Sequence, residues 1–281
     1  MLQFRSIFLL VLPALSACQP ALESGAQRST VALPVDAQRA ASESADSERS
    51  RERAAEIALP AGYASARAAL LGAGWLPLRD PECWTKVGGR AEVCNVLPET
   101  EACSSDGHCV VHFGHIGQAK LLRVTIYGDW AAPDLARAEG LEVKSSQESP
   151  VAATPSLACP ASTFEGFLAA FAADEATRVA FTAPLVRVAE LNSTDEGDVP
   201  RAVLIPGDVY AGFNVRHGNG AFHHVDAWGK VDPAPLPLDV KRADETYEVR
   251  YHYGMSEGNS YAFEAHEGCW RLVADPEPPA P

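Results

Sequence analysis

The sequence predicts an α+β protein of two small disulfide-stabilised domains, in each of which a helix packs on a mainly antiparallel sheet. Two observations support this prediction. Each half of the folded chain begins with a segment of helical apolar spacing, and runs of β-type alternation follow it. Of the seven cysteines, one lies near the N-terminus, four form a cluster and two lie far apart. This four-plus-two division matches the division into two domains.

Residues 1–17 have the features of a secretory signal peptide. Arg5 supplies the positive charge, residues 7–15 are apolar, and small residues end the segment. The apolar run is shorter than the roughly 20 residues that a membrane-spanning helix needs. The segment therefore predicts export of the chain.

The junction Leu15-Ser16-Ala17-Cys18 resembles the lipobox of bacterial envelope lipoproteins. The resemblance implies that lipid is attached to the Cys18 thiol, that the chain is cleaved before Cys18, and that the new amino group is acylated, as with palmitate. Gln19 after this cysteine implies an outer-membrane lipoprotein facing the periplasm. The alternative is an ordinary secretory signal with a cysteine at the cleavage site by chance.

Residues 18–59 are rich in Ala, Ser, Glu and Arg and contain no aromatic residue. Such a segment cannot bury enough apolar area to offset its ordering entropy, so it is predicted to be a disordered tether. A flexible chain of about 40 residues spans roughly 35 Å.

Residues 60–130 are predicted to form a small Cys-rich α+β domain. A helix over 63–71 would place Tyr63, Ala66, Leu70 and Leu71 on one face, and glycines end it. Strands are predicted at 75–78, where Pro77 requires a sheet edge, and at 109–116 and 120–127. This order of elements resembles small exported lipoprotein domains of the β-lactamase-inhibitor and outer-membrane-assembly types. Residues 131–155 are predicted to be a linker.

The six cysteines after Cys18 predict a disulfide framework, because an even number in an oxidising compartment is typical of one. The first four allow three connectivities. Pairing of Cys83 with Cys94 and of Cys103 with Cys109 is favoured, because both close short loops that contain turn residues. Cys159 with Cys269 would join the start of the second domain to its last strand. A zinc site is the alternative, but the chain has no Cys-x-x-Cys pair.

Residues 156–275 are predicted to form the second α+β domain, followed by a Pro-rich tail at 276–281. Ser162 and Glu165 have the spacing of a capping box before a helix over 163–173. Strands are expected at 185–191, 202–205, 209–215, 222–228, 247–253, 260–266 and 269–273. Aromatic residues on these strands, including Trp228 and Tyr210, are expected to fill the core or to line a pocket.

Three segments of this domain carry a resemblance to a fold. They are the Phe-x-x-Phe-x-x-x-Phe helix, the strand entry Thr182-Ala183-Pro184-Leu185 and the closing strand Cys269-Trp270-Arg271-Leu272. Together they resemble uncharacterised bacterial lipoproteins and, in plan, the cone-shaped nuclear-transport-factor-like domains. That family usually has three helices, whereas this sequence predicts one or two.

Histidines are the residues to examine for chemistry, because their charge changes near neutral pH. His217 and His223 flank a turn, and His224 and Asp226 would share a strand face, so these four form a candidate ligand site. The alternative is a solvent-exposed hairpin edge. His112 and His115 would point to opposite faces of a strand. No catalytic set can be assigned, and no metal site or cofactor is predicted.

The net charge of −14 argues against nucleic-acid binding, which depends on Lys and Arg neutralising phosphates. We therefore expect a binding or interaction module of the envelope, held at the membrane by its lipid and contacting an envelope protein partner. One alternative is a small-ligand-binding protein or enzyme with a pocket in the 185–273 sheet. The other is an inhibitor or assembly accessory of another envelope protein.

Overall fold

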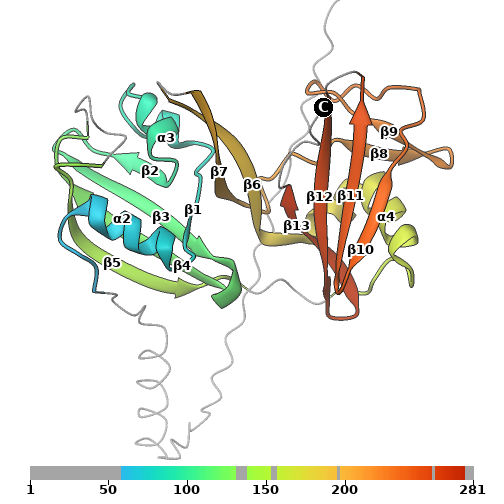
Figure 1. Cartoon of the computed structure of the whole chain (residues 1–281), viewed down its shortest axis with the longest axis horizontal. Coiled ribbons are helices and arrows are strands. Elements are labelled where there is room, and N and C mark those ends of the chain that lie inside the picture. The colour runs from blue at the N-terminus through green and yellow to red at the C-terminus, as the bar shows by residue number, and fades with distance from the viewer. Residues whose placement is uncertain (1–57, 131–137, 153–156, 195–196, 255–256, 276–281) are drawn as a thin grey trace, which may run out of the picture. The chain divides into compact units, whose positions relative to one another are not determined.

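The computed structural model describes residues 58–130, 138–152, 157–194, 197–254 and 257–275 (Figure 1). These residues form a mixed α+β structure with few helices and mostly antiparallel sheets, as the sequence predicts. They all belong to one compact unit, Arg53–Pro281. The division into two domains and the likeness to nuclear-transport-factor-like domains therefore stay predictions. The signal peptide, Cys18, the tether up to residue 57 and the tail lie outside the described residues.

The first sheet has the order β1-β3-β4-β5, and β2 pairs with β3. Its strands are antiparallel and comprise β1 (Leu76–Pro77), β2 (Thr100–Cys103), β3 (His108–His115), β4 (Lys120–Tyr127) and β5 (Glu142–Pro150). As predicted, the strand that contains Pro77 lies at the edge of the sheet, where its missing N–H breaks no hydrogen-bond ladder.

Strand β5 corrects the prediction of a linker over 131–155. Its polar sequence lacks apolar alternation, yet its backbone pairs with β4 from Lys120↔Pro150 to Tyr127↔Glu142. Only Ser146 of this strand is buried. Backbone hydrogen bonds are the main stabilisation of an edge strand. The spacing of apolar residues in the sequence does not predict such bonds.

Helix α2 (Tyr63–Gly72) packs on this sheet, and α3 (Glu92–Val96) and two 3₁₀ turns, η1 (Cys83–Thr85) and η2 (Ile116–Gln118), complete the region. Tyr63, Ala66 and Leu70 are buried as predicted. Leu71 is not, because 37% of its surface is exposed. The helix therefore buries a narrower face than expected.

The second sheet has the order β10-β11-β12-β13-β6-β7, and a separate hairpin joins β8 to β9. The strands are β6 (Thr182–Thr194), β7 (Gly197–Pro206), β8 (Val215–Gly218), β9 (Ala221–His224), β10 (Asp239–Ala243), β11 (Thr246–Tyr253), β12 (Glu257–His266) and β13 (Cys269–Asp275). Strands β13 and β6 run parallel, whereas the other described pairs in this sheet are antiparallel.

Two predicted strands of this region are wrong in extent. A strand was predicted over 209–215, but residues 207–214 form a loop, and β8 begins at Val215. Side chains hold this loop in place: the Tyr210 hydroxyl donates to Asp275 at 2.7 Å, and the Asn214 N–H donates to the Tyr261 hydroxyl at 3.1 Å. Strand β9 ends at His224, and a tight turn replaces the rest of the predicted 222–228 strand. Strand β10, entirely exposed, was not predicted.

Helix α4 (Phe164–Ala173) lies against the second sheet and is followed by α5 (Glu175–Ala180). The N-cap of α4 is Thr163, whose hydroxyl accepts from the Gly166 N–H at 3.2 Å, so the prediction of a Ser162 capping box is wrong. The predicted aromatic face is confirmed, since Phe164, Phe167 and Phe171 pack in the core around Phe263.

The three predicted disulfide pairings are confirmed by the cysteine geometry: Cys83–Cys94, Cys103–Cys109 and Cys159–Cys269. The first joins η1 to α3, and the second joins the paired residues at the end of β2 and near the start of β3. The third joins the segment before α4 to the first residue of β13.

The two sheets meet where β1 runs beside β7. Leu78 forms a parallel bridge with Leu204, and the Arg79 N–H donates to the Leu204 carbonyl at 2.9 Å. The Arg79 guanidinium also binds the Glu190 carboxylate at 2.6 Å. At this meeting point β3 carries Gly114, because a Cβ there would approach the Leu204 side chain to 2.5 Å. Close packing of the sheets therefore depends on a residue without a side chain.

Candidate functional site

In the structure, the side chains of His217, His223, His224 and Asp226 do not converge on a common ligand site. His217 packs on the Phe222 ring, with 4.9 Å between ring centroids, and His223 Nδ1 lies 3.1 Å from the carbonyl oxygens of Asp232 and Ala234. Both histidines therefore serve the hairpin of β8 and β9 and the loop that follows it. Neither contacts Asp226 in the described part of the chain.

The predicted pairing of His224 with Asp226 is not formed. Asp226 Oδ1 instead accepts from the N–H groups of Trp228 and Lys230, at 3.0 and 2.9 Å, which closes a tight turn. The His224 ring stacks on the Tyr253 ring, with 3.9 Å between centroids. The carboxylate beside this stack belongs to Asp232, which accepts from the Tyr253 hydroxyl at 2.7 Å.

Asp232 has a lowered pKa, mainly because the Ala234 N–H and then the Tyr253 hydroxyl donate to its ionised form. Asp232 lies in a loop for which the sequence predicted no functional residue. Trp228 also departs from expectation: it neither fills the core nor lines a pocket, since the closed turn leaves 90% of its surface exposed.

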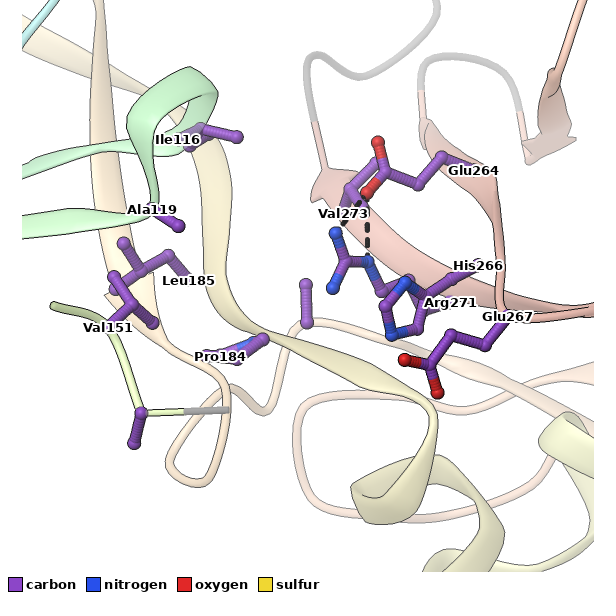
Figure 2. Close-up of a pocket in the computed structure, with 12 residues that line it drawn as sticks. Ile116, Ala119, Val151, Pro184, Leu185, Glu264, His266, Glu267, Arg271 and Val273 are labelled. Atoms are coloured by element: carbon purple, nitrogen blue, oxygen red, sulfur yellow. Dashed lines mark hydrogen bonds and ion pairs between the residues drawn. The ribbon is translucent and has the colours of Figure 1, made fainter. Parts of the chain in front are cut away.

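A cavity of about 250 Å³ lies where β6 leaves β13 (Figure 2). Thr182 pairs with Leu272 and Arg187 pairs with Ala274, so one residue of β13 opposes residues 183–186. This bulge carries Pro184, which has no N–H for the ladder. Bulges of this kind open a sheet locally and are frequent beside functional sites.

Gly207 packs against the bulge on the side away from the cavity. Its N–H donates to the Pro184 carbonyl at 2.9 Å, and a Cβ at this position would approach the Ala183 carbonyl oxygen to 2.0 Å. The backbone therefore passes directly behind the cavity wall, and only glycine fits. The backbone therefore fixes the position of the bulge.

One wall of the cavity is apolar and draws on distant parts of the sequence. Figure 2 shows Ile116 and Ala119 from the turn between β3 and β4, Val151 after β5, and Pro184 and Leu185 from the bulge. The Val151 N–H donates to the Ala119 carbonyl at 2.8 Å, which fixes these two segments to each other.

The opposite wall is charged and comes from β12 and β13. Arg271 donates through Nε and Nη2 to one oxygen of Glu264, at 2.8 and 2.5 Å. His266 and Glu267 lie beside this ion pair (Figure 2). The turn that presents them contains Glu267 and Gly268, both with positive φ, and ends at the disulfide-bonded Cys269. The charged groups are therefore on a rigid hairpin.

None of the four charged-wall residues was among the candidates drawn from the sequence. His266 and Arg271 were placed on predicted strands, but the side chains across the cavity belong to segments from about 80 to about 155 positions earlier in the chain. The sequence signal for the cavity was Pro184 near the start of a predicted strand. Proline cannot donate to the hydrogen-bond ladder, so within a strand it often marks a bulge.

A second polar cluster lies inside the second sheet. The hydroxyls of Tyr251 and Tyr261 both donate to Asn214 Oδ1, and Tyr210 donates to Asp275. Burial, followed by the charge of Asp275, raises the pKa of Tyr210, and burial also raises the pKa of Asp275. These groups hold the 207–214 loop on the sheet, which is a structural role.

We expect alkaline pH to destabilise the fold through its buried tyrosines. Burial raises the pKa of Tyr63 and Tyr261 well above the ordinary value, with the charge of Glu99 adding to the shift at Tyr63. Above about pH 10 the unfolded chain releases these protons and the folded chain keeps them, so unfolding becomes easier as pH rises. The expected loss is about 1.4 kcal/mol per pH unit for each tyrosine.

Urea denaturation at pH values from neutral to about 11, with tyrosinate absorbance recorded in parallel, measures this loss. The variant Tyr63→Phe removes one contribution, leaves those of Tyr210 and Tyr261, and should give a shallower slope. Full ionisation of all tyrosines in the folded protein near their ordinary pKa would contradict the prediction.

Within the described residues there is no cluster of three or more metal-ligating side chains, and no helix long and apolar enough to cross a membrane. Comparison with known proteins gave no match to a family model, to a curated protein or to a solved structure.

Proposed function

We propose that this chain is a lipid-anchored protein of the bacterial envelope that acts as a binding module, with its ligand held in the cavity at the β6 bulge. The lipobox-like junction at Cys18 and the signal peptide before it support the location. Three disulfides support folding in an oxidising compartment.

The cavity carries the proposal of binding. Ligand sites in proteins are concave and mostly apolar, with a few convergent polar groups that fix orientation. Here an apolar wall faces the Glu264–Arg271 pair, and the bulge that opens the space is held by a tight backbone contact at Gly207. The proposed site includes residues of the 185–273 sheet but none of His217, His223, His224 and Asp226.

The anchor predicts a definite mass for the mature N-terminus. The N-terminal peptide should begin at Cys18 and carry a diacylglyceryl group and an amide-linked acyl chain, and the protein should fractionate with outer membranes. The variant Cys18→Ala should be released from the membrane fraction, because one or more acyl chains supply the membrane affinity. An unmodified Cys18 thiol in the native protein would contradict the anchor.

The cavity predicts binding of an uncharged apolar probe. The full mature chain with Cys18→Ala, exported by a non-lipoprotein leader so that disulfides form, should enhance the fluorescence of N-phenyl-1-naphthylamine. Val151→Trp fills the space from the apolar wall and should weaken probe binding by about tenfold or more, equivalent to about 1.4 kcal/mol.

Val199→Trp is the matched control, because Val199 is 51% exposed on β7 and does not line the cavity. It should leave probe binding unchanged. If the unsubstituted protein does not bind the probe, or if both tryptophan variants weaken it equally, the cavity is not the binding site.

A further inference from the structure

The cavity has an apolar wall and a charged wall, so its ligand should have two chemical parts. Ile116, Val151 and Leu185 offer apolar surface, and the charged wall lies across from them (Figure 2). A wholly apolar ligand would remove water from the guanidinium of Arg271 without replacing its hydrogen bonds, which costs free energy. A small inorganic ion would leave the apolar wall in contact with water. A short apolar chain with one polar end therefore fits both walls.

The unused N–H groups of Arg271 determine which polar end fits. A guanidinium has five N–H donors. Nε and Nη2 each direct one of them to the same oxygen of Glu264, at 2.8 and 2.5 Å. The other donors, on Nη1 and Nη2, have no hydrogen-bond or ion-pair partner among the described residues. The edge of the guanidinium formed by Nη1 and Nη2 is therefore free to donate two parallel hydrogen bonds.

This free edge points into the cavity. In Figure 2 the Glu264 carboxylate lies against the Nε side of the guanidinium, and the Nη1–Nη2 edge faces the apolar wall. Glu264 and Arg271 are directly opposite each other on β12 and β13, so their ion pair fixes the orientation of the guanidinium. The free donors are therefore in position before a ligand arrives.

The carboxylates of the charged wall leave the free edge accessible to an anion. Arg271 balances the charge of Glu264, and in Figure 2 Arg271 and His266 lie between the carboxylates of Glu264 and Glu267. An anion at the Nη1–Nη2 edge therefore meets the guanidinium first. The net charge of −14 acts from more distant residues, and salt screens such charges beyond about 8 Å at physiological ionic strength. Direct contact with the guanidinium therefore decides the sign of the ligand.

We infer that the cavity binds a carboxylate on a short apolar chain, the chemistry of a short-chain fatty acid. The carboxylate accepts two parallel hydrogen bonds from Nη1 and Nη2 of Arg271, and this paired geometry is a strong one for arginine and carboxylate. The chain lies on the apolar wall, and a volume of about 250 Å³ limits it to a few carbons. The inference rests on the proposed binding function and names the ligand class of that same site.

Three probes of equal chain length test the inference. Hexanoate, 1-hexanol and hexylamine are titrated at neutral pH against N-phenyl-1-naphthylamine bound to the full mature chain with Cys18→Ala. Hexanoate should displace the dye at about tenfold lower concentration than 1-hexanol, because only the carboxylate accepts both hydrogen bonds. Hexylamine should be the weakest, because its ammonium group meets the guanidinium.

Arg271→Gln tests the residue that carries the inference. It should weaken hexanoate by about tenfold or more and leave dye and 1-hexanol binding within about twofold, since neither uses the guanidinium charge. The matched control is Arg250→Gln on β11, because Arg250 binds Glu248 through Nε and Nη2 in the same way, outside the cavity. The control should keep the order of the three probes, and equal losses of hexanoate in both variants would contradict the inference.

Glu264→Gln gives a test that a misfolded variant cannot imitate. The amide oxygen still accepts from Arg271, but the negative charge beside the free edge is removed. Hexanoate binding should therefore tighten by at least about threefold, whereas 1-hexanol should be unaffected. Weaker binding of hexanoate by a variant that still binds the dye normally would contradict the proposed role of Arg271.

Failure of the inference and failure of the proposed function give different results. If the dye binds and Val151→Trp weakens it, but hexanoate is no better than 1-hexanol or hexylamine, the ligand class is wrong and the cavity remains a binding site. If the dye does not bind the unsubstituted protein, the proposed binding function fails as well.

Discussion

Replacing both Cys159 and Cys269 by alanine is expected to lower the free energy of unfolding by about 4–5 kcal/mol. The bond closes a loop with a sequence separation of 110 residues, which is far longer than the loops closed by the other two disulfides. In the chain-entropy account a longer closed loop restricts the unfolded chain more, so its loss costs more. Urea denaturation of the oxidised proteins measures the difference.

The double variant Cys103→Ala with Cys109→Ala is the internal control. These cysteines are separated by 6 residues, so the expected cost is about 2 kcal/mol. Equal losses for the two double variants would contradict the loop-length argument. The urea m-value should rise when the longer loop is opened, because the unfolded chain without the bond is less compact.

Replacing Arg67 by alanine is expected to destabilise the fold by about 3–5 kcal/mol, because the change leaves a buried carboxylate uncompensated. Glu99 is 0% exposed, and Arg67 donates to both of its oxygens, at 2.5 and 3.3 Å. The Tyr63 hydroxyl donates to the same carboxylate at 2.7 Å, but a neutral donor does not replace the opposite charge.

Adding Glu99→Gln to Arg67→Ala removes the buried charge and should recover part of the loss. Thermal unfolding of the single and double variants gives the comparison. A loss below about 1 kcal/mol for Arg67→Ala would place this pair with ordinary surface ion pairs and contradict the prediction.

Helices and strands with a clear local pattern of apolar residues were predicted correctly from the sequence. Tyr63, Ala66 and Leu70 repeat with helical spacing, and the aromatic face of α4 and the alternation of β3 and β4 are equally clear. The pairs Cys83–Cys94 and Cys103–Cys109 followed from short loops with turn residues. In each case the information lies within a few neighbouring residues.

Elements stabilised by distant partners were not predictable in this way. Strand β5 has a polar sequence and is defined by its pairing with β4. The 207–214 loop looks like a strand, but Tyr210 and Asn214 bind side chains of β13 and β12 instead of a neighbouring ladder. The cavity is the extreme case, since Val151 faces Arg271 only because β13 lies beside β6.

The parallel pairing of β13 with β6 also governs when the chain can fold. The second sheet places its last strand in the interior, between β12 and β6, so the sheet cannot close until residue 275 is present. Contacts this distant in sequence form slowly, because loop-closure entropy must be overcome first. A chain emerging N-terminus first from a translocation channel would therefore keep β6 and β7 without their parallel neighbour until export is complete. The core of the second sheet is therefore completed only after the last strand has been made.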